Sequence, residues 1–337
     1  MRPLSFWQNS PDTPGIRARL LSPLGNLYAR ATARRVARPA AFRPPMPVIC
    51  VGNLNAGGTG KTPTVLALVQ HLQARGLRPG VISRGHGGRL PGPVEVNERR
   101  HKAEETGDEP LLISSFARTW IGRERATAAR AAAEAEIDIL LMDDGHQNPD
   151  VAKDLSVIVV DAARGFGNGL CLPAGPLREP VAQGLARADV LISIGNEAAQ
   201  STFRAQWGQY VKIPHVNASL RALETGMDWE GTRVLAFAGI GHPEKFFGTL
   251  RYLGAELVQT VPLDDHQPLT PTLFKRLETD AKAIGAQLVT TEKDAVRLPK
   301  DFIREVLTLP VRLHIDDWKT LDRLLAPAID AAKDLSR

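Results

Sequence analysis

The chain of 337 residues is 43% hydrophobic and 23% charged, which is typical of a folded globular protein with room for two domains or one large α/β unit. It contains no run of 18 apolar residues that could span a bilayer, its N-terminus lacks the apolar core of a signal peptide, and Cys50 and Cys171 are its two cysteines. This composition argues against a transmembrane protein and a disulfide scaffold, and we expect the bulk of the protein in the cytosol.

Positive charge is concentrated at the N-terminus, where residues 1–45 contain eight arginines and one acidic residue. Pro23 and Gly25 interrupt this segment, so it predicts either one helix or two short ones. A basic amphipathic segment can lie in the interface of an anionic membrane, or it can pack on its own domain with its basic face in solvent. Nucleic acid is a third candidate, without an aromatic pattern or module to support it. The apolar residues on one helical face are Ile16, Leu20, Leu24, Leu27, Tyr28 and Ala31.

The next part of the chain alternates apolar strands with helices. We predict strands at 48–51, 79–83, 137–142, 156–161 and 190–194, and helices at 64–75, 109–118, 123–136 and 181–188. Continuous apolar strands separated by helices indicate a parallel sheet covered on both faces.

A second alternating set follows residue 233. It predicts strands at 234–237, 256–261, 287–290 and 306–309, and helices at 244–253, 271–284 and 317–332. The stretch 196–232 shows no clear periodicity, and we interpret it as the connection between two domains.

Residues 48–62 combine an apolar strand with a glycine-rich turn that ends in Gly60-Lys61-Thr62 and leads into a helix. In such a loop backbone N–H groups surround phosphates, the lysine reaches the β- and γ-phosphates, and the hydroxyl binds Mg²⁺. A purely structural turn is the alternative. The usual pattern has glycine where this chain has Asn55. The predicted nucleotide-binding residues are Asn55, Ala56, Gly57, Gly58, Thr59, Gly60, Lys61 and Thr62.

Four further groups of charged or titratable residues follow predicted strands or precede a helix. Asp143 and Asp144 end a strand, where paired acids suit a nucleotide-bound Mg²⁺ or cap a turn. Asp108 is either a helix N-cap, which the residues alone favour, or a general base. Arg178 is either a phosphate clamp or part of a surface ion pair. The loop histidine His266 could relay a proton, although most such histidines are inert.

Seven short motifs occur in the same order in the tetraacyldisaccharide 4′-kinases of lipid A biosynthesis, which this chain resembles over nearly its whole length. The family's loop also lacks glycine at the position of Asn55. The motifs are Gly52-Asn53-Leu54 with Gly57-Gly58-Thr59-Gly60-Lys61-Thr62-Pro63, Ser83-Arg84-Gly85, Gly107-Asp108-Glu109-Pro110, Asp143-Asp144-Gly145, Leu172-Pro173-Ala174-Gly175-Pro176-Leu177-Arg178-Glu179, Asp265-His266 and Thr291-Glu292-Lys293-Asp294.

The resemblance implies a kinase that transfers the γ-phosphate of ATP to the 4′-hydroxyl of tetraacyldisaccharide 1-phosphate and so forms lipid IV-A. It implies a peripheral enzyme at the cytosolic face of the bacterial inner membrane, with 1–45 as the membrane contact and no nucleic-acid or protein partner. It also implies an α/β fold, with a P-loop NTPase-like parallel sheet at 46–215 and a second, smaller α/β/α domain at 216–337 that closes over the nucleotide.

The resemblance also implies a role for each residue that lies in a matching motif. Asp108 is the expected base for the 4′-hydroxyl, oriented by His266, while Lys61 and Arg178 neutralise charge on the transferring phosphoryl group. Thr62, Asp143, Asp144 and Glu179 are the expected Mg²⁺ and phosphate site. The chain departs from the family's usual residues at His86, His146 and Gln267.

Two other protein classes share the P-loop. A metallochaperone or regulatory GTPase needs a base-reading motif and a Cys/His metal cluster, and the sequence contains neither. A soluble ligase of the dethiobiotin-synthetase type has no need of a basic, apolar N-terminal segment. Both are therefore less compatible with the sequence than the lipid kinase.

Overall fold

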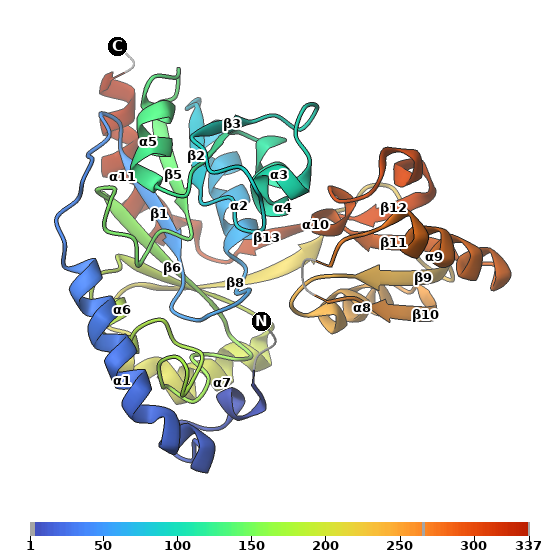
Figure 1. The fold of residues 1–337 in the computed structure, drawn as a ribbon, viewed down its shortest axis with the longest axis horizontal. Helices are drawn as coiled ribbons and strands as arrows, with labels where there is room; N and C mark the ends of the chain where they lie inside the picture. Colours follow the sequence, from blue (N-terminus) through green and yellow to red (C-terminus); the bar gives the residue numbers. More distant parts are fainter. Residues whose placement is uncertain (1–3, 265–266, 336–337) are drawn as a thin grey trace.

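The computed structural model describes residues 4–264 and 267–335 and confirms the expected α/β class (Figure 1). Its larger sheet has nine strands, and every pair from β8 to β4 is parallel, whereas β13 and β3 pair antiparallel at the two edges. Across the sheet the order is β13 (Val311–Ile315), β8 (His215–Ala222), β7 (Val190–Ile194), β6 (Leu155–Asp161), β1 (Val48–Gly52), β5 (Ile139–Asp143), β2 (Pro79–Ser83), β4 (Arg118–Ile121) and β3 (Val94–Val96).

Helices cover both faces of this sheet because alternate strand residues point to opposite sides. Ile49 and Val51 of β1 pack with one set of helices, and Val48 and Cys50 belong to the core on the other face. The first set is α2 (Lys61–Gln73), α4 (Asp108–Ser114) and α11 (Trp318–Leu335). The second is α1 (Ile16–Val36), α5 (Arg125–Ala133), α6 (Val181–Leu185) and α7 (Glu197–Trp207). We call the nine-stranded sheet with these helices the large body.

Residues 233–309 form a second unit, the small body, which lies beside the large body (Figure 1). Its four strands are all parallel, and two separate apolar cores cover the faces of the sheet, one beneath α8 and one beneath α9. The elements are β9 (Arg233–Ala238), α8 (Pro243–Tyr252), β10 (Glu256–Pro262), α9 (Pro271–Ala283), β11 (Gln287–Thr291), α10 (Glu292–Ala295) and β12 (Val306–Leu309). The remaining short helices are η1 (Ser5–Gln8), α3 (Ala103–Thr106) and η2 (Gly208–Tyr210) outside the small body, and η3 (Lys300–Glu305) within it.

The boundary expected at residue 216 differs from the sheet topology. β8 and β13 are both strands of the large sheet, and α11 packs on the core of the large body. The small body is therefore an insertion between two paired strands, whose pairing continues in the bond from the Leu223 N–H to the Pro310 carbonyl. Hydrophobic periodicity cannot reveal this return, because it carries no information on which strands pair.

Two local predictions were also wrong. The stretch 196–232 is not irregular, because it contains α7 and β8, whose mixed polar sequence reflects the incomplete burial of the strand. The helix predicted at 109–118 stops at Ser114, and β4 follows. A four-residue strand directly after a helix leaves too short a period-2 pattern to be recognised.

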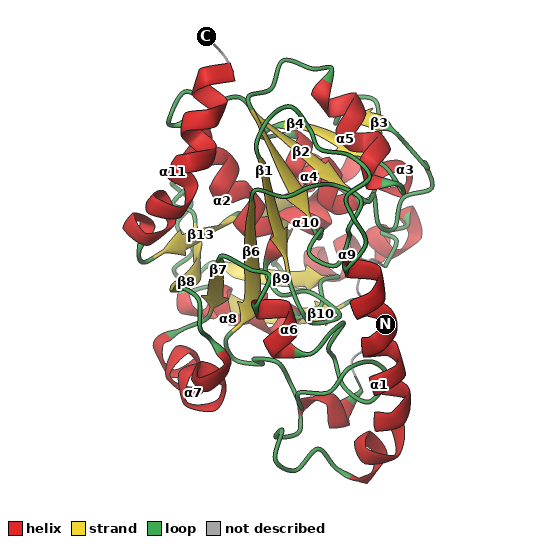
Figure 2. Cartoon of the chain, turned by 90° about the vertical axis from the view of Figure 1, so that its left-hand side faces the viewer, coloured by secondary structure: helices red, strands yellow, loops and turns green. Residues whose placement is uncertain are grey.

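The N-terminal segment forms one helix, α1, on the side of the large body away from the small body (Figures 1 and 2). Pro23 lies inside it, and Gly25 allows close packing, since a Cβ there would be 2.8 Å from the Cys171 carbonyl oxygen. Ile16, Leu20 and Leu24 point outward, with 77%, 76% and 54% of their surface exposed. Among the described helices, none is long and apolar enough to cross a membrane.

Candidate active site

The glycine-rich turn links β1 to α2 as predicted. Gly57 has φ of 112° and Gly60 has φ of 94°, a region that residues with a Cβ rarely adopt. At Gly60 a Cβ would also meet Ile194 at 2.4 Å, whereas at Gly57 and Gly58 it would meet nothing within 4 Å. The loop is thus pinned at Gly60 and open on its outer side, as a phosphate-binding loop requires.

Asparagine side chains fix the shape of this loop from within. Asn53, fully buried, donates to the Gly57 carbonyl at 3.2 Å and to the Thr59 hydroxyl at 2.9 Å. Asn55 donates to the Gly165 carbonyl at 3.0 Å, and the Ala56 N–H donates to the Pro176 carbonyl at 2.7 Å. The Asn55 amide and the Ala56 N–H are therefore engaged by the protein itself, which explains why the loop needs no glycine at position 55.

Lys61, Asp144 and Arg178 form a charged cluster beside the loop. The Asp144 Oδ1 lies 3.6 Å from the Lys61 Nζ and 2.7 Å from the Arg178 Nη1. Burial opposes the ionisation of Asp144, but the two cations outweigh it and hold its pKa well below the usual range. The motifs around residues 61, 144 and 178 therefore meet at one point, with Lys61 and Arg178 both directed at the same carboxylate.

Asp143 lies in a different environment at the end of β5. Burial, together with the negative charges of Glu109 and Asp144, raises its pKa to about 7. Its Oδ2 accepts a weak hydrogen bond from Ser83 at 3.3 Å, and its Oδ1 is buried without a hydrogen-bond partner among the described residues. Such an orphaned carboxylate oxygen is suited to a cation that binds there.

Glu179 is held by neighbours that the sequence did not indicate. Its carboxylate accepts two bonds from Arg187, at 2.7 and 3.0 Å, and one from Gln147 at 2.8 Å. Burial opposes ionisation, but these donors lower the pKa of Glu179. Gln147 also donates to the Asn53 carbonyl and faces Arg178 at 3.4 Å. Both carboxylate oxygens of Glu179 therefore accept hydrogen bonds. Through Gln147, the residue also supports the backbone at Asn53.

Asp108 lies at the first turn of α4 and is 4% exposed. Gly107 before it has φ of 90°, and a Cβ there would be 2.5 Å from the His86 carbonyl, so glycine is required for this close approach. The negative charge of Glu109, next to Asp108, is one of the causes that raise the pKa of Asp143. Lys293 and Arg297 of the small body lie 3.8 and 3.9 Å from the Asp108 Oδ2.

The predicted residue His266 lies outside the described residues, as does Asp265 of the same motif. Among the residues that the structure does describe, no group of three or more His, Cys, Asp or Glu side chains could hold a metal ion. The predicted set of Thr62, Asp143, Asp144 and Glu179 is therefore not assembled as an all-protein metal cage.

Several site residues escaped the sequence reasoning. Arg125 is buried and donates to the backbone carbonyls of Asp143 and Asp144 at 3.1 and 2.7 Å, which holds Asp144 at its positive φ of 51°. Gln147 could have been suspected from its place just after the acid pair. The role of Lys293 had no local signal, because its partner Asp108 lies 185 positions earlier in the chain.

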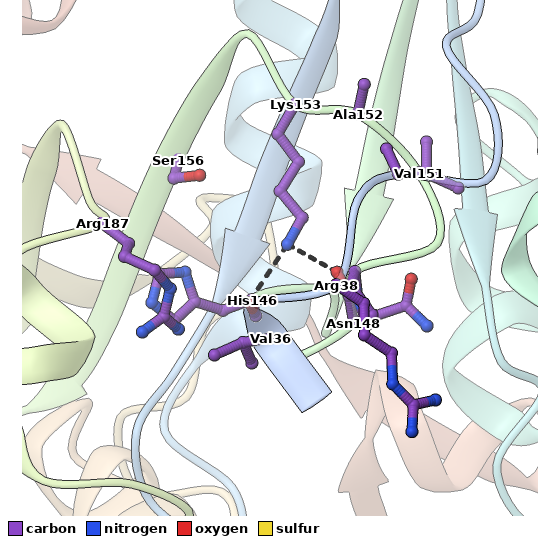
Figure 3. Close-up of a pocket in the computed structure, with 11 residues that line it drawn as sticks. Val36, Arg38, His146, Asn148, Val151, Ala152, Lys153, Ser156 and Arg187 are labelled. Atoms are coloured by element: carbon purple, nitrogen blue, oxygen red, sulfur yellow. Dashed lines mark hydrogen bonds between the residues drawn. The ribbon is translucent and has the colours of Figure 1, made fainter. Parts of the chain in front are cut away.

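A separate cavity of about 280 Å³ lies where the chain passes from β5 to β6 (Figure 3). Lys153 enters it and donates to the carbonyls of His146 and Asn148 at 3.1 and 2.7 Å. Arg187, which also binds Glu179, and Arg38 from beyond α1 line its other sides. The cavity thus shares Arg187 with the hydrogen bonds that hold Glu179, and none of its lining residues belongs to the P-loop.

Known proteins resemble this chain over most of its length. The family model described as Tetraacyldisaccharide-1-P 4′-kinase matches residues 17–330. A tetraacyldisaccharide 4′-kinase of Dinoroseobacter shibae is 62% identical over 98% of this chain and 97% of its own, and one of Jannaschia is 55% identical over 96% and 97%. The crystal structure of Aquifex aeolicus LpxK in complex with ATP shares the fold, with a TM-score of 0.72, 23% identity and coverage of 93% of this chain and 100% of that one. The chain therefore belongs to the tetraacyldisaccharide 4′-kinase family.

Proposed function

We propose that this protein is the kinase that transfers the γ-phosphate of ATP to the 4′-hydroxyl of tetraacyldisaccharide 1-phosphate, which forms lipid IV-A in lipid A biosynthesis. The observation that carries the proposal is the convergence of Lys61 and Arg178 on Asp144 beside an open glycine loop. Two cations that meet beside such a loop are suited to balance the charge of a transferring phosphoryl group, which supports the proposal. Family membership supplies the identity of the acceptor.

In this mechanism the chain mainly positions and neutralises charge. The loop from Gly57 to Thr62 surrounds the phosphates, and Lys61 and Arg178 exchange part of their contact with Asp144 for phosphate oxygens. Arg125 holds Asp144 by donating a hydrogen bond to its backbone carbonyl. Gln147 holds Arg178 by accepting a hydrogen bond from its guanidinium group. Such prearranged donors lower the barrier without covalent chemistry in the protein.

Mg²⁺ fits the residues at the end of β5. Asp143 and Asp144 are adjacent carboxylates, one with an orphaned oxygen, and Thr62 stands at the start of α2. Mg²⁺ prefers one or two carboxylates with phosphate oxygens and water, so a three-carboxylate cage is not needed. When bound, the ion supplies electrostatic stabilisation to the phosphates. Glu179 would act behind these ligands, because Arg187 and Gln147 occupy its oxygens.

Asp108 is the proposed base for the 4′-hydroxyl. Its Oδ1 accepts the N–H of Glu109 at 3.1 Å, which orients the carboxylate at the first turn of α4. Lys293 and Arg297 support its charged form, and a charged carboxylate is the one that can accept a proton. The assignment of His266 as its orienting partner remains part of the proposal.

We also propose that α1 rests on the cytosolic face of the inner membrane. Its outer side carries Ile16, Leu20, Leu24 and Leu27, each more than half exposed in the described part of the chain, and arginines of the same helix flank this stripe. Apolar residues between basic ones favour the interface of an anionic membrane. A lipid substrate has to be reached there, and no covering element of the described chain hides the stripe.

One experiment tests the function directly. The protein is incubated with γ-labelled ATP, Mg²⁺ and tetraacyldisaccharide 1-phosphate in detergent, and label is followed into lipid. We expect label to enter the lipid, and to do so only when the 4′-hydroxyl is present. A protein that hydrolyses ATP without labelling the lipid would contradict the proposal.

A further inference from the structure

We propose that Lys293 is a positioning residue for phosphoryl transfer: its ammonium group fixes the carboxylates of Asp108 and Glu109, and so makes the base depend on the docking of the small body. The inference rests on the proposed function, because it concerns the base of that reaction. It gives a role to the Thr291-Glu292-Lys293-Asp294 motif, for which the sequence offered none.

The geometry begins at the end of β11. Thr291 caps α10 by accepting the Asp294 N–H at 3.1 Å, which fixes the direction of the short helix. Lys293 then extends toward α4, where its Nζ lies 3.1 Å from the Glu109 Oε1 and 3.8 Å from the Asp108 Oδ2. A side chain of the small body thus contacts two adjacent carboxylates of the large body.

The contact suits a proton acceptor. Lys293 and Arg297 stand 3.8 and 3.9 Å from the same oxygen of Asp108, within the range of ion pairing. These distances exceed hydrogen-bond length but are short enough for the two cations to stabilise the charged carboxylate. Meanwhile the closer Lys293–Glu109 pair fixes the lysine, so that Glu109 serves as the anchor of the arrangement.

Lys293 differs from Arg297 in where it is anchored. Arg297 pairs with Asp294, donates to the carbonyls of Gly239 and Gln267 at 3.1 and 3.0 Å, and is almost fully buried, so it helps to hold the small body itself together. Both described ion pairs of Lys293 cross to α4 instead. Removal of Lys293 therefore breaks the described contacts with α4, and circular dichroism checks that the small body stays folded.

A second contact between the two bodies provides a comparison. Lys245 of α8 lies 2.6 Å from Asp161 at the end of β6. Nearby, Arg164 lies 3.0 Å from the His242 Nδ1. These pairs also join the bodies, but they contact neither Asp108 nor Glu109. If Lys293 acted only by holding the bodies together, loss of Lys245 would have the same consequence.

The test compares Lys293→Met, Lys293→Arg and Lys245→Met in the full-length enzyme, with label transfer to the lipid as the assay. We expect Lys293→Met to lower kcat by about tenfold to a hundredfold, since small misplacement of a reacting group has effects of this size. The KM for ATP should stay within about twofold, because the P-loop is untouched. Lys293→Arg should recover most of the lost rate, and Lys245→Met should lose far less of it.

Every outcome of this test either supports or overturns the role proposed for Lys293. A Lys293→Met enzyme with wild-type kcat, or a Lys245→Met enzyme with an equal loss, overturns the inference alone. If Lys293→Met fails to fold, as judged by circular dichroism, Glu109→Gln removes the anchor from the other side and should give the same selective loss of kcat; a wild-type kcat there overturns the inference. A wild-type protein that labels no lipid overturns the proposed function and this inference with it.

Discussion

The two bodies of this molecule are built from the same kind of parallel sheet but contribute to the site in different ways. In the large body β1, β5 and β7 are buried at every position, and they present a backbone loop and an acid pair at one edge. In the small body the central strands β9 and β11 are also mostly buried, and only the edge strand β10 is buried at none of its positions. The contribution of this body to the site comes from side chains at α10. The large body thus contributes a backbone loop and acidic residues at strand ends. The small body contributes charged side chains that contact the large body.

The largest effect is expected where the two bodies meet. Asp108→Asn removes the proposed base but keeps the shape of its side chain, and we expect kcat to fall by about 100- to 10,000-fold, the usual range for loss of a general base. ATP affinity, measured by calorimetry, should change little because the P-loop belongs to the large body. Asp301→Asn on the small-body surface is the matched control. A variant that keeps its rate would remove Asp108 from the mechanism.

Within the large body, Lys61→Ala should cost about 100- to 1000-fold in kcat, because a prearranged positive group at the transferring phosphate is lost. ATP binding should weaken as well, in contrast to Asp108→Asn. The measurements are label transfer to lipid and ATP titration, with Lys212→Ala as a control at an exposed lysine. Unchanged ATP affinity in Lys61→Ala would show that the loop does not hold the phosphates as proposed.

Measurements of stability can show whether the two bodies unfold independently of each other. Leu277 is fully buried in a core that belongs to the small body alone. Leu277→Ala should lower the free energy of unfolding there by about 2–5 kcal/mol, through lost burial and a cavity. Hydrogen exchange should then speed up within residues 233–309 while β1 and β5 stay protected. Equal loss of protection in both bodies would show that they unfold as one unit.

The smallest expected effect concerns α1. Changing Leu20 and Leu24 to serine removes two exposed apolar side chains, and we expect co-sedimentation with vesicles of anionic phospholipid to fall by about tenfold. Leu223→Ser, an exposed leucine beyond β8, is the control and should leave sedimentation unchanged. Wild-type partitioning of the double variant would mean that α1 is not the membrane contact.

The parts of the site that sequence predicted are those encoded in consecutive residues. Gly60-Lys61-Thr62 follows a strand and begins a helix, and Asp143-Asp144 ends one, so their positions at the sheet edge could be inferred before any fold was known. The contribution of Arg125 could not, because it consists of hydrogen bonds to the backbone carbonyls of Asp143 and Asp144, which only the folded chain brings near.

The sequence by itself therefore determined the alternation of strands and helices, the phosphate loop, the acid pair and the basic amphipathic start, because each depends on local spacing. The tertiary structure alone decided that β8 and β13 rejoin the large sheet around the small body, and that Lys293 meets Asp108. These are pairings between distant segments, and their physical basis is strand register and ion-pair geometry, neither of which leaves a periodic trace in the chain.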